Sequence, residues 1–543
     1  MTPAAANTYD YVIVGGGSAG CALASRLSED AERRVLLLEA GPADRSPYIH
    51  LPVCYYKTTK GPLTWGFELA AQQRQEGITP AYAQARVLGG GSSINAQVYI
   101  RGSAEDYDGW VDMGCPGWSY REVLPYFKRS EANERLAGAY HGTDGPLGVS
   151  DQRHTHPLSK VFVQACQEFG MPYNADFNGA AQSGCGLYQV TNRNGRRCSA
   201  AVGYLGKARG RNNLTVRTGV LVHRIVLRNG RAVGVEYAEN GRLTEANADA
   251  QVIVTAGAIN SPKLLMLSGI GPAAHLASHG IDVKADLPGV GQNLHDHLDV
   301  FLMYNLKGIT SYDTYRKPHR QLWAGIQYAA FRNGPVSATV VEGGAFWATS
   351  KRLAQPDLQF HFLAGTGIEA VTDGHSSGNG CTLNAYFLHP RSRGSVTLKS
   401  ADPSVAPSID PNFLAERYDL DRTVESLEIG EEIMAQPTMA KYIANRFMPG
   451  PEISTRAGYE AYVRREARSG YHPVGTCKMG LDEMAVVDPQ LRVHGIDGLM
   501  VADSSIMPRL VSGNTNAPSI MIGERASDFL RGNRIETSKG QAA

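Results

Sequence analysis

The N-terminal part of the chain alternates short apolar runs with a helical pattern. Residues 11–14 and 35–38 are consecutive apolar positions, and residues 18–28 between them show helical spacing. Two buried strands joined by a helix within about 30 residues normally pair in parallel. The pattern therefore predicts a βαβ unit over residues 10–40.

Similar patterns return in the middle and at the end of the chain. Residues 213–255 alternate apolar and polar positions, which predicts antiparallel strands. Helical patterns cover residues 320–332, 420–435 and 517–529, and the last of these follows an apolar run at 499–502. Because strand–turn–helix segments occur at both ends and in the middle, we expect a discontinuous cofactor domain that a second domain interrupts.

The composition is that of an ordinary globular protein. The chain has 543 residues, of which 43% are hydrophobic and 19% charged, so it can bury a large core. A formal net charge of +1 gives no reason to expect nucleic acid or an anionic membrane as a partner. The 8 cysteines include no CxxC pair, which argues against a zinc site or a redox dithiol. Without a signal-peptide pattern or a long apolar stretch, we expect a cytoplasmic protein with no transmembrane segment.

A glycine-rich turn follows the first predicted strand and opens the first helix. In this GxGxxG pattern Gly15 permits a tight turn, Gly17 lets the backbone approach a pyrophosphate, and Gly20 lets helix and strand pack closely. The helix N-terminus offers free N–H groups to the phosphates. Glu39 lies 19 residues after Gly20 at the end of the second strand, where a carboxylate accepts hydrogen bonds from ribose hydroxyls. These features predict a dinucleotide site.

Three segments together resemble one enzyme family. They are residues 11–39, residues 85–102 with a second glycine cluster, and residues 257–271. The chain resembles the glucose–methanol–choline (GMC) oxidoreductases, and their choline dehydrogenase-like branch in particular. The resemblance implies an enzyme that uses FAD. Some relatives attach FAD covalently through a histidine just before Asn95, and because Ile94 stands there in this chain we expect non-covalent FAD.

The third of these segments also predicts a helix from its own residues. Ser261 suits the N-cap position and Pro262 the first helical position. Gly269 suits the position after the last turn. We therefore expect a helix that begins at Pro262 and ends before Gly269.

The resemblance further implies a fold class and a division of the chain. The expected fold is α/β (α+β), with a Rossmann-like FAD-binding domain and a substrate domain that has a mixed or antiparallel sheet and helices. We assign residues 1–155, 206–300 and 465–543 to the FAD-binding domain. The substrate domain then consists of residues 156–205 and 301–464.

The expected FAD-binding residues combine the fingerprint with positions that the resemblance implies. They come from each FAD-domain segment. They are Gly15, Gly17, Ser18, Ala19, Gly20, Glu39, Arg86, Gly90, Gly91, Ser92, Asn95, Val222, Ala256, Asp503, Ala517 and Pro518.

Two C-terminal segments resemble the catalytic motifs of the family. Residues 470–480 carry His472 and residues 514–518 carry Asn516. Oxidation of a primary alcohol to an aldehyde requires loss of the hydroxyl proton and transfer of a hydride to flavin N5. A neutral imidazole is a suitable base for that proton, and an amide N–H can stabilise the developing alkoxide. We therefore predict His472 as general base and Asn516 as its partner, although Asn516 also suits a helix cap.

The substrate and the alternatives stay open at this point. Glu342 and Tyr471 are candidate substrate-binding residues, and a carboxylate with aromatic neighbours suits a quaternary ammonium such as choline. Glu342 serves equally well as a turn carboxylate, so a primary alcohol is the broader expectation. Either oxygen or a quinone-type acceptor can take the electrons. The alternatives are a hydroxynitrile lyase that retains FAD and a flavin-binding protein without catalysis.

Two further features are interpreted as structural. His295 and His297 have the spacing of a metal pair on a strand, but no third ligand is evident and we expect no metal. Cys477 lies five residues after His472, and nothing in its sequence neighbourhood lowers the pKa of its thiol. We expect Cys477 to serve in packing.

Overall fold

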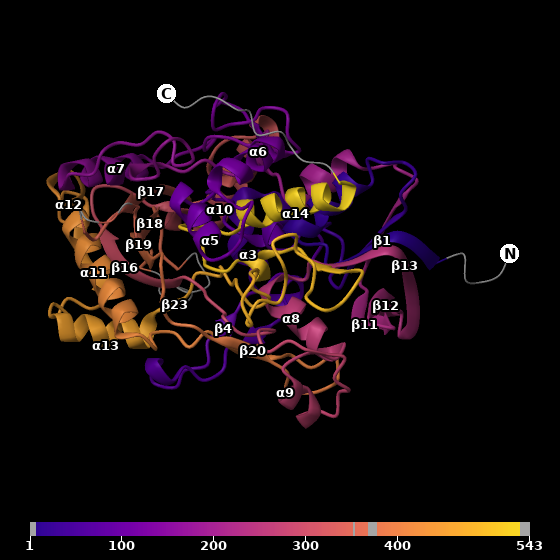
Figure 1. Cartoon of the computed structure of the whole chain (residues 1–543). Helices are drawn as coiled ribbons and strands as arrows, with labels where there is room; N and C mark the ends of the chain where they lie inside the picture. Colours follow the sequence, from indigo (N-terminus) through magenta and orange to yellow (C-terminus); the bar gives the residue numbers. More distant parts are fainter. Residues whose placement is uncertain (1–6, 351–352, 354, 368–376, 533–543) are drawn as a thin grey trace.

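The computed structural model describes residues 7–350, 353, 355–367 and 377–532. Within them the chain builds two large sheets that lie side by side, with the first sheet on the right in Figure 1 and the second on the left. Both ends of the described chain belong to the first sheet and its helices, while much of the second half builds the second sheet. This order agrees with an α/β fold, and the exact domain boundaries stay a prediction.

The first sheet has a parallel core with an antiparallel extension. In spatial order its strands are β10 (Leu214–Thr218), β2 (Val35–Glu39), β1 (Thr8–Val14), β13 (Arg242–Val254), β12 (Arg231–Glu239) and β11 (Leu221–Arg228), with β24 (Leu499–Val501) also beside β13. The predicted βαβ unit is confirmed, because β1 and β2 pair in parallel and α1 (Ser18–Leu27) joins them.

The prediction of antiparallel strands throughout residues 213–255 was wrong for β10. That strand pairs in parallel with β2, and Leu214 lies opposite Val35. The chain reaches β10 by a long crossover and not by a hairpin, and an alternating pattern reports only that a strand has two unlike faces. The strands β11, β12 and β13 are antiparallel as predicted.

The second sheet is antiparallel and carries helices on its outer side. In spatial order its strands are β22 (Ile443–Met448), β16 (Leu298–Leu306), β19 (Gly380–Phe387), β18 (Leu358–Leu363), β17 (Val341–Trp347) and β7 (Gly184–Leu187), with β23 (Arg468–Ser469) also beside β16. The outer layer, on the left in Figure 1, consists of α7 (Pro157–Phe169), α11 (Arg417–Met434), α12 (Pro437–Ala440) and α13 (Arg456–Glu466). Residues of β16, β18 and β19 are buried on both faces, so polar side chains in these strands find partners inside the sheet, as Asn384 does by donating to Asp299.

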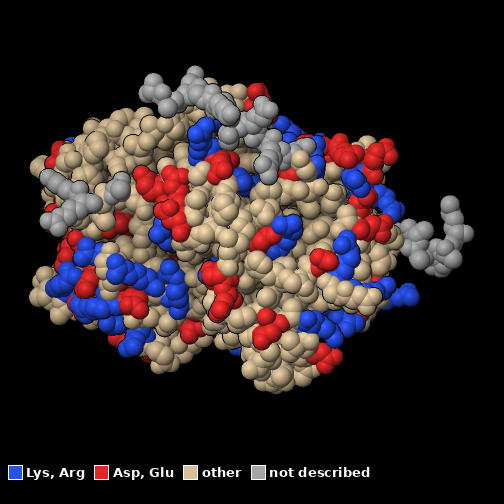
Figure 2. Space-filling view, in the orientation of Figure 1, with Lys and Arg blue, Asp and Glu red and all other residues tan. Residues whose placement is uncertain are grey.

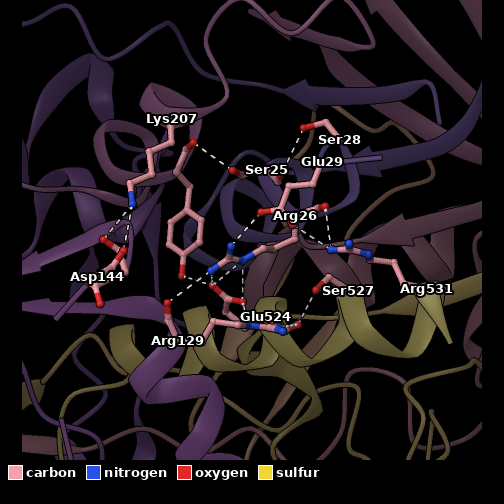
Figure 3. Close-up of polar contacts among 12 residues, drawn as sticks. Ser25, Arg26, Ser28, Glu29, Arg129, Asp144, Lys207, Glu524, Ser527 and Arg531 are labelled. Carbon is pink, nitrogen blue, oxygen red and sulfur yellow. Dashed lines mark hydrogen bonds and ion pairs between the residues drawn. The ribbon is translucent and has the colours of Figure 1, made fainter. Parts of the chain in front are cut away.

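The C-terminal helix packs closely on the first helix of the chain. A Cβ on Gly523 of α14 (Asn516–Arg531) would lie 2.4 Å from the Ala19 carbonyl oxygen, so only glycine permits this approach. Deeper along the contact, the buried carboxylate of Glu524 accepts hydrogen bonds from Arg26, Arg129 and Tyr204, as Figure 3 shows for the two arginines. These contacts hold the N-terminus of α14 in register with the N-terminus of α1.

The helix predicted after Ser261 begins earlier than expected. It is α8 (Gly257–Leu267), and Pro262 lies inside it. Pro262 has no N–H for the carbonyl of Ala258, and Thr476 Oγ1 donates to that carbonyl instead at 2.6 Å. The prediction was wrong because this compensation comes from a residue more than 200 positions away.

Other helices surround the two sheets. The helices predicted over residues 320–332, 420–435 and 517–529 are confirmed as α10 (Pro318–Phe331), α11 and α14. The remaining α-helices are α2 (Pro47–His50), α3 (Tyr55–Thr58), α4 (Gly91–Ile94), α5 (Ala104–Asp112), α6 (Tyr120–Ser130) and α9 (Ala273–Ser278).

The face of the molecule in Figure 2 shows basic and acidic side chains interspersed, in keeping with the small net charge. Both signs occur over each half of the view. Of the helices that the structure describes, none has both the length and the apolar character that crossing a membrane requires.

Candidate functional site

An elongated cavity follows the carboxyl ends of the parallel strands and reaches the second sheet. Gly17 and Glu39 line one end of it, and His472, His361 and Tyr386 line the other. Ligands of open α/β sheets bind at the carboxyl ends of the strands. The cavity therefore joins the predicted dinucleotide site to the predicted catalytic residues.

The glycines of the fingerprint have different environments. Gly15 has a φ of +109°, and a Cβ there would lie 2.4 Å from the Thr255 carbonyl oxygen. A Cβ on Gly20 would lie 2.0 Å from the Gly15 carbonyl oxygen, so Gly20 serves the packing of α1. A Cβ on Gly17 would meet only Thr255 O, at 3.9 Å, and would otherwise project into the cavity. The open side of Gly17 is where a pyrophosphate can approach the helix N-terminus.

Glu39 ends β2 and faces the same end of the cavity. Its Oε2 accepts a hydrogen bond from Gly16 N at 2.8 Å, and its Oε1 accepts one from Gly41 N at 2.7 Å. Burial raises the pKa of the Glu39 carboxyl to about 7, although the two backbone N–H groups oppose this rise. The carboxylate thus has a fixed orientation and lone pairs left for ribose hydroxyls.

The second glycine cluster packs against the first. A Cβ on Gly90 would lie 2.7 Å from the Gly17 Cα, whereas a Cβ on Gly91 would meet no atom within 4 Å. Asn95 lines the cavity, and its Oδ1 accepts a hydrogen bond from the buried guanidinium of Arg197 at 2.7 Å. The two glycine turns therefore form adjoining walls of one site.

His472 is held in one orientation and one tautomer by Asp296 and His297, just before β16, and by Leu388, just after β19. Leu388 O can only accept, so the 3.1 Å contact assigns the proton to His297 Nε2. The Nδ1 of His297 then accepts from His472 Nδ1 at 3.0 Å. The lone pair of His472 therefore lies on Nε2, on the ring edge opposite that contact. Asp296 holds the backbone, because its Oδ1 accepts from His472 N at 2.7 Å.

Burial keeps these imidazoles neutral. It lowers the pKa of His472 to about 4 and that of His361, which also lines the cavity, to about 3. It also lowers the pKa of His297 well below its usual value, and the nearby His472 adds to this effect. A neutral His472 with its lone pair on Nε2 is in the form that a general base requires.

The carboxamide that is hydrogen-bonded to His472 belongs to Asn514. Asn514 Nδ2 donates to His472 Nε2 at 3.1 Å, and Gln359 Nε2 donates to Asn514 Oδ1 at 3.3 Å. Asn516 lies in the first turn of α14, and its Oδ1 accepts from Ser18 Oγ at 2.8 Å. Its Nδ2 is buried and has no hydrogen-bond partner among the described residues. Sequence reasoning missed Asn514, although it lies in the same motif two positions before Asn516.

The structure places a different carboxylate at the cavity from the one expected. Glu342 does not line it, and this residue lies on β17 with Oε1 accepting from Tyr312 OH and Oε2 from Ser159 Oγ at 2.7 Å. Asp299 of β16 does line the cavity, and its Oδ2 accepts from Asn384 Nδ2 at 2.7 Å. The expectation for Glu342 is corrected in this respect. Tyr471 lines the cavity as expected, with a φ of +63°.

Most of the other expected cofactor residues line the cavity. Those that do are Gly15, Gly17, Ser18, Ala19, Glu39, Gly90, Gly91, Asn95, Val222, Ala256 and Asp503. Those that do not are Gly20, Arg86, Ser92, Ala517 and Pro518.

The residues outside the lining have structural contacts. The Arg86 guanidinium lies 5.0 Å from the centre of the Trp65 ring, and Trp65 itself lines the cavity. Ser92 Oγ accepts from Ala200 N at 2.9 Å, which ties the second glycine turn to the neighbouring segment. Ala517 and Pro518 are buried in the first turn of α14.

The structure also places the histidine pair His295 and His297 and the thiol of Cys477, for which the sequence predicted a structural role. His295 Nε2 contacts Asn293 Oδ1 at 2.9 Å, whereas His297 contacts His472. In the part of the chain that the structure describes, no group of three or more His, Cys, Asp or Glu side chains could hold a metal ion. Cys477 is buried, and burial raises the pKa of its thiol well above the usual value.

The residues along the cavity fit FAD. The open side of Gly17 and the helix N-terminus suit a pyrophosphate, and the Glu39 carboxylate suits a ribose. The buried Nδ2 of Asn516, whose Oδ1 accepts from Ser18 Oγ next to Gly17, offers an unused donor to a cofactor oxygen. The same cavity continues to His472 and Tyr386, so a long dinucleotide accounts for the whole lining.

Comparisons with known proteins agree with this assignment. A family model described as GMC oxidoreductase matches residues 9–299, and a second one with the same description matches residues 390–523. Together these two matches span most of the chain.

Individual relatives cover almost the whole chain. It is 43% identical over 528 residues to an alcohol dehydrogenase (acceptor) of Pseudomonas putida, covering 96% of this chain and 95% of the relative. It is 42% identical over 539 residues to a mitochondrial choline dehydrogenase of Homo sapiens, covering 96% and 90%. Among solved structures, pyridoxine 4-oxidase from Mesorbium loti has a TM-score of 0.88 and 31% identity, covering 97% of this chain and 99% of that one.

Proposed function

The chain belongs to the GMC oxidoreductase family and is an FAD-dependent oxidoreductase of CH–OH donors, and on this premise we propose that His472 is its general base in the oxidation of a primary alcohol to an aldehyde. The observation that carries the proposal is the relay from Leu388 O through His297, which leaves the lone pair of His472 on Nε2. The relatives named above are dehydrogenases and an oxidase, so the lyase alternative receives no support from them.

In the proposed mechanism the alcohol hydroxyl displaces the Asn514 amide and donates to His472 Nε2. His472 takes the hydroxyl proton, and its Nδ1–H bond to His297 holds the ring in place as the imidazolium forms. Such a positioned base contributes a rate factor of ~10²–10⁴. A carboxamide N–H of this segment donates to the alkoxide-like oxygen, as an oxyanion-hole group does: Asn514 Nδ2 lies 3.1 Å from His472 Nε2, and the buried Nδ2 of Asn516 has no hydrogen-bond partner among the described residues. Bound FAD supplies the hydride acceptor.

We propose that Gly17, the N-terminus of α1 and Glu39 hold the nucleotide half of FAD, and that Asn95 and Asn516 lie at the flavin half. Non-covalent attachment is part of this proposal, because Ile94 stands where a covalent link would need a histidine. The electron acceptor, oxygen or a quinone, and the cytoplasmic location stay predictions.

The proposed activity is tested by anaerobic mixing of the yellow enzyme with primary alcohols. Bleaching of the oxidised flavin band supports the proposal, and an unchanged band with every alcohol contradicts it. The panel includes choline and its uncharged isostere 3,3-dimethylbutan-1-ol, because Asp299, Trp65 and Tyr386 line the cavity. A carboxylate among aromatic rings favours a cationic group, so we expect choline to bleach the flavin faster than the isostere.

The relay through His297 gives a prediction of its own. In His297→Phe the acceptor of the His472 Nδ1 proton is lost, so the tautomer with the lone pair on Nε2 is no longer favoured. We expect kcat to fall by about tenfold or more with little change in KM, because such a group acts through the base. The measurement is steady-state kinetics with the best alcohol of the panel. His297→Asn, which keeps an acceptor on a shorter side chain, should recover part of the loss, and equal kcat values in all three proteins would contradict the relay.

The buried state of His472 predicts an unusual pH profile. Burial places the folded-state pKa near 4, below the 6.5 of an exposed histidine, so the base stays neutral as the pH falls through 6.5. We expect kcat/KM to stay level there and to decline only as the pH approaches 4. Between the two values the unfolded chain binds protons that the folded chain does not, so the free energy of unfolding decreases as the pH falls. An apparent pKa of 6.5 or higher in kcat/KM would show that the base is another group or is solvated.

A further inference from the structure

The helix α10 presents its large apolar side chains to solvent. Leu322, Trp323, Ile326 and Phe331 are 67%, 68%, 50% and 73% exposed. The buried residues of this 14-residue helix are only Ala324 and Tyr328. A surface helix normally does the reverse, with its apolar stripe on the core and its polar residues outward.

The exposed apolar residues form one arc of the helix. At 3.6 residues per turn Leu322, Trp323 and Ile326 project within about a third of the helix circumference, and the exposed Ala329 and Ala330 fall in the same sector. Isolated exposed apolar residues are common and need no explanation, but a contiguous arc with an aromatic residue indicates an interaction surface. We therefore interpret Leu322, Trp323 and Ile326 as a contact site for an apolar surface outside the chain.

A second segment extends this surface. The short helix η7 (Pro335–Ser337) packs against both α10 and η2 (Pro52–Cys54), and η2 leads directly into α3. Tyr48 and Tyr56 in this second segment are 45% and 37% exposed, and Lys57 Nζ lies 4.8 Å from the centre of the Tyr48 ring. We call the exposed residues Tyr48, Tyr56, Lys57, Leu322, Trp323 and Ile326 the α10–α3 face.

The two segments that carry the α10–α3 face have charged side chains of one sign only. Residues 314–341 and residues 45–67 contain no Asp or Glu, although the whole chain has nearly equal numbers of acidic and basic residues. These two segments supply Arg45, Lys57, Lys60, Arg316, Lys317, Arg320 and Arg332. Of these, Arg316 lies 3.9 Å from the carboxylate of the buried Asp313.

We propose that the α10–α3 face docks on an anionic lipid bilayer, with Leu322, Trp323 and Ile326 at the boundary between headgroups and acyl chains. An apolar arc with a tryptophan and flanking basic residues is the pattern of a helix that lies in the membrane interface. The basic side chains then meet anionic headgroups, each with a favourable contribution that salt screens. A symmetric contact between two copies would instead bring the same basic residues of both chains together.

The α10–α3 face lies close to the wall of the cavity. Tyr55 and Thr59 line the cavity, whereas Tyr56 and Lys57 between them are exposed on the outer side of α3. The short helix α3 thus separates the cavity from the proposed bilayer surface. An alcohol or an electron acceptor dissolved in the bilayer would be close to the cavity wall, and the docking itself does not depend on the reaction.

The test measures binding of the FAD-loaded enzyme to vesicles by co-sedimentation. We expect the enzyme to sediment with vesicles of equal parts phosphatidylcholine and phosphatidylglycerol, and much less with phosphatidylcholine alone. The bound fraction should fall as salt is raised, because the Debye length shortens. No binding to the anionic vesicles, or equal binding to both kinds, would overturn the proposal.

The variants test whether vesicle binding depends on the α10–α3 face or is nonspecific adsorption. The combined variant Leu322→Gln, Trp323→Gln and Ile326→Gln should lower the partition coefficient by about tenfold or more, because binding scales with the apolar area that enters the interface. Leu481→Gln is the matched control, since Leu481 is 67% exposed like Leu322 but lies outside the face. The control should bind as the unaltered protein does. Equal FAD content and melting temperature would show that the combined variant is folded.

A second measurement covers the case in which the combined variant misfolds. Lipids brominated on the acyl chain should quench part of the tryptophan fluorescence of the unaltered protein, and Trp323→Phe should remove most of that quenching. Quenching that persists in Trp323→Phe would overturn the proposed orientation. Sedimentation velocity without lipid tests whether a second copy of the chain covers the face instead. If the unaltered protein is a dimer, if the combined variant is a monomer and if neither binds vesicles, the face belongs to a contact between two copies and the proposal is overturned.

Discussion

His472→Ala is expected to keep FAD bound and to lose most of its reduction by alcohol, with a rate lower by ~10²–10⁴-fold. The imidazole lies at the far end of the cavity from Gly17 and Glu39, so its loss leaves the nucleotide contacts in place. The alanine also removes the imidazole whose neutral form burial favours, together with the acceptor of the Asn514 amide hydrogen bond. Anaerobic stopped-flow measurement of flavin reduction, with the absorbance of bound flavin as a check of occupancy, gives both quantities.

The matched control for this variant is His279→Ala. His279 is half-buried in the loop after α9 and does not line the cavity, so its replacement should leave the reduction rate unchanged. A His472→Ala enzyme that reduces its flavin at the normal rate would show that the base lies elsewhere, and His361 would then be the first residue to test. Loss of bound flavin in His472→Ala would show that the residue supports the cofactor as well as the reaction.

Gly17→Val is expected to give a folded protein without bound FAD. The backbone of Gly17 has a φ of −79°, which a valine can adopt, and its Cβ would meet only one protein atom, at 3.9 Å. The side chain would instead fill the space where the pyrophosphate approaches the N-terminus of α1. We expect a colourless protein whose circular dichroism matches that of the unaltered protein after its cofactor has been removed.

Valine at Gly15 is expected to have a different effect from valine at Gly17, and valine at the distant Gly206 serves as the control. Gly15→Val should damage the fold itself, because Gly15 has a φ of +109° and its Cβ would lie 2.4 Å from Thr255 O. Gly206→Val should stay yellow, since a Cβ on Gly206 meets no atom within 4 Å and the residue does not line the cavity. Stoichiometric FAD in Gly17→Val would refute the assignment of the fingerprint.

The sequence alone predicted the features that depend on neighbouring residues. The turn at Gly15 and Gly17, the strands around it and the helix α1 follow from local spacing, because a strand, a tight turn and a helix N-terminus are formed by consecutive residues. Glu39 could be identified at its distance from the fingerprint for the same reason. The position of His472 at the cavity was also predicted, but from a family motif and not from any local physical property.

The active-site details that sequence reasoning missed depend on contacts between distant segments. Asp299 reaches the cavity while Glu342 does not, because β16 lies next to the C-terminal segment 468–472 and β17 lies further along the same sheet. The partner of His472 is decided by the path of residues 513–516, which places Asn514 at Nε2 and turns the Oδ1 of Asn516 toward Ser18. Spacing along the chain carries no information about either choice.

What the sequence by itself determined about this protein is therefore its class of fold and its dinucleotide turn, since short motifs and local spacing carry both, whereas His472 as the base stays a prediction from a family motif. The tertiary structure alone decided the tautomer of His472, the carboxylate at the cavity and the outward face of α10. Each of these depends on which atoms from remote segments come within hydrogen-bond or packing distance. A helical pattern specifies that α10 has an apolar side, but only the packing of its neighbours decides whether that side meets the core or the surroundings.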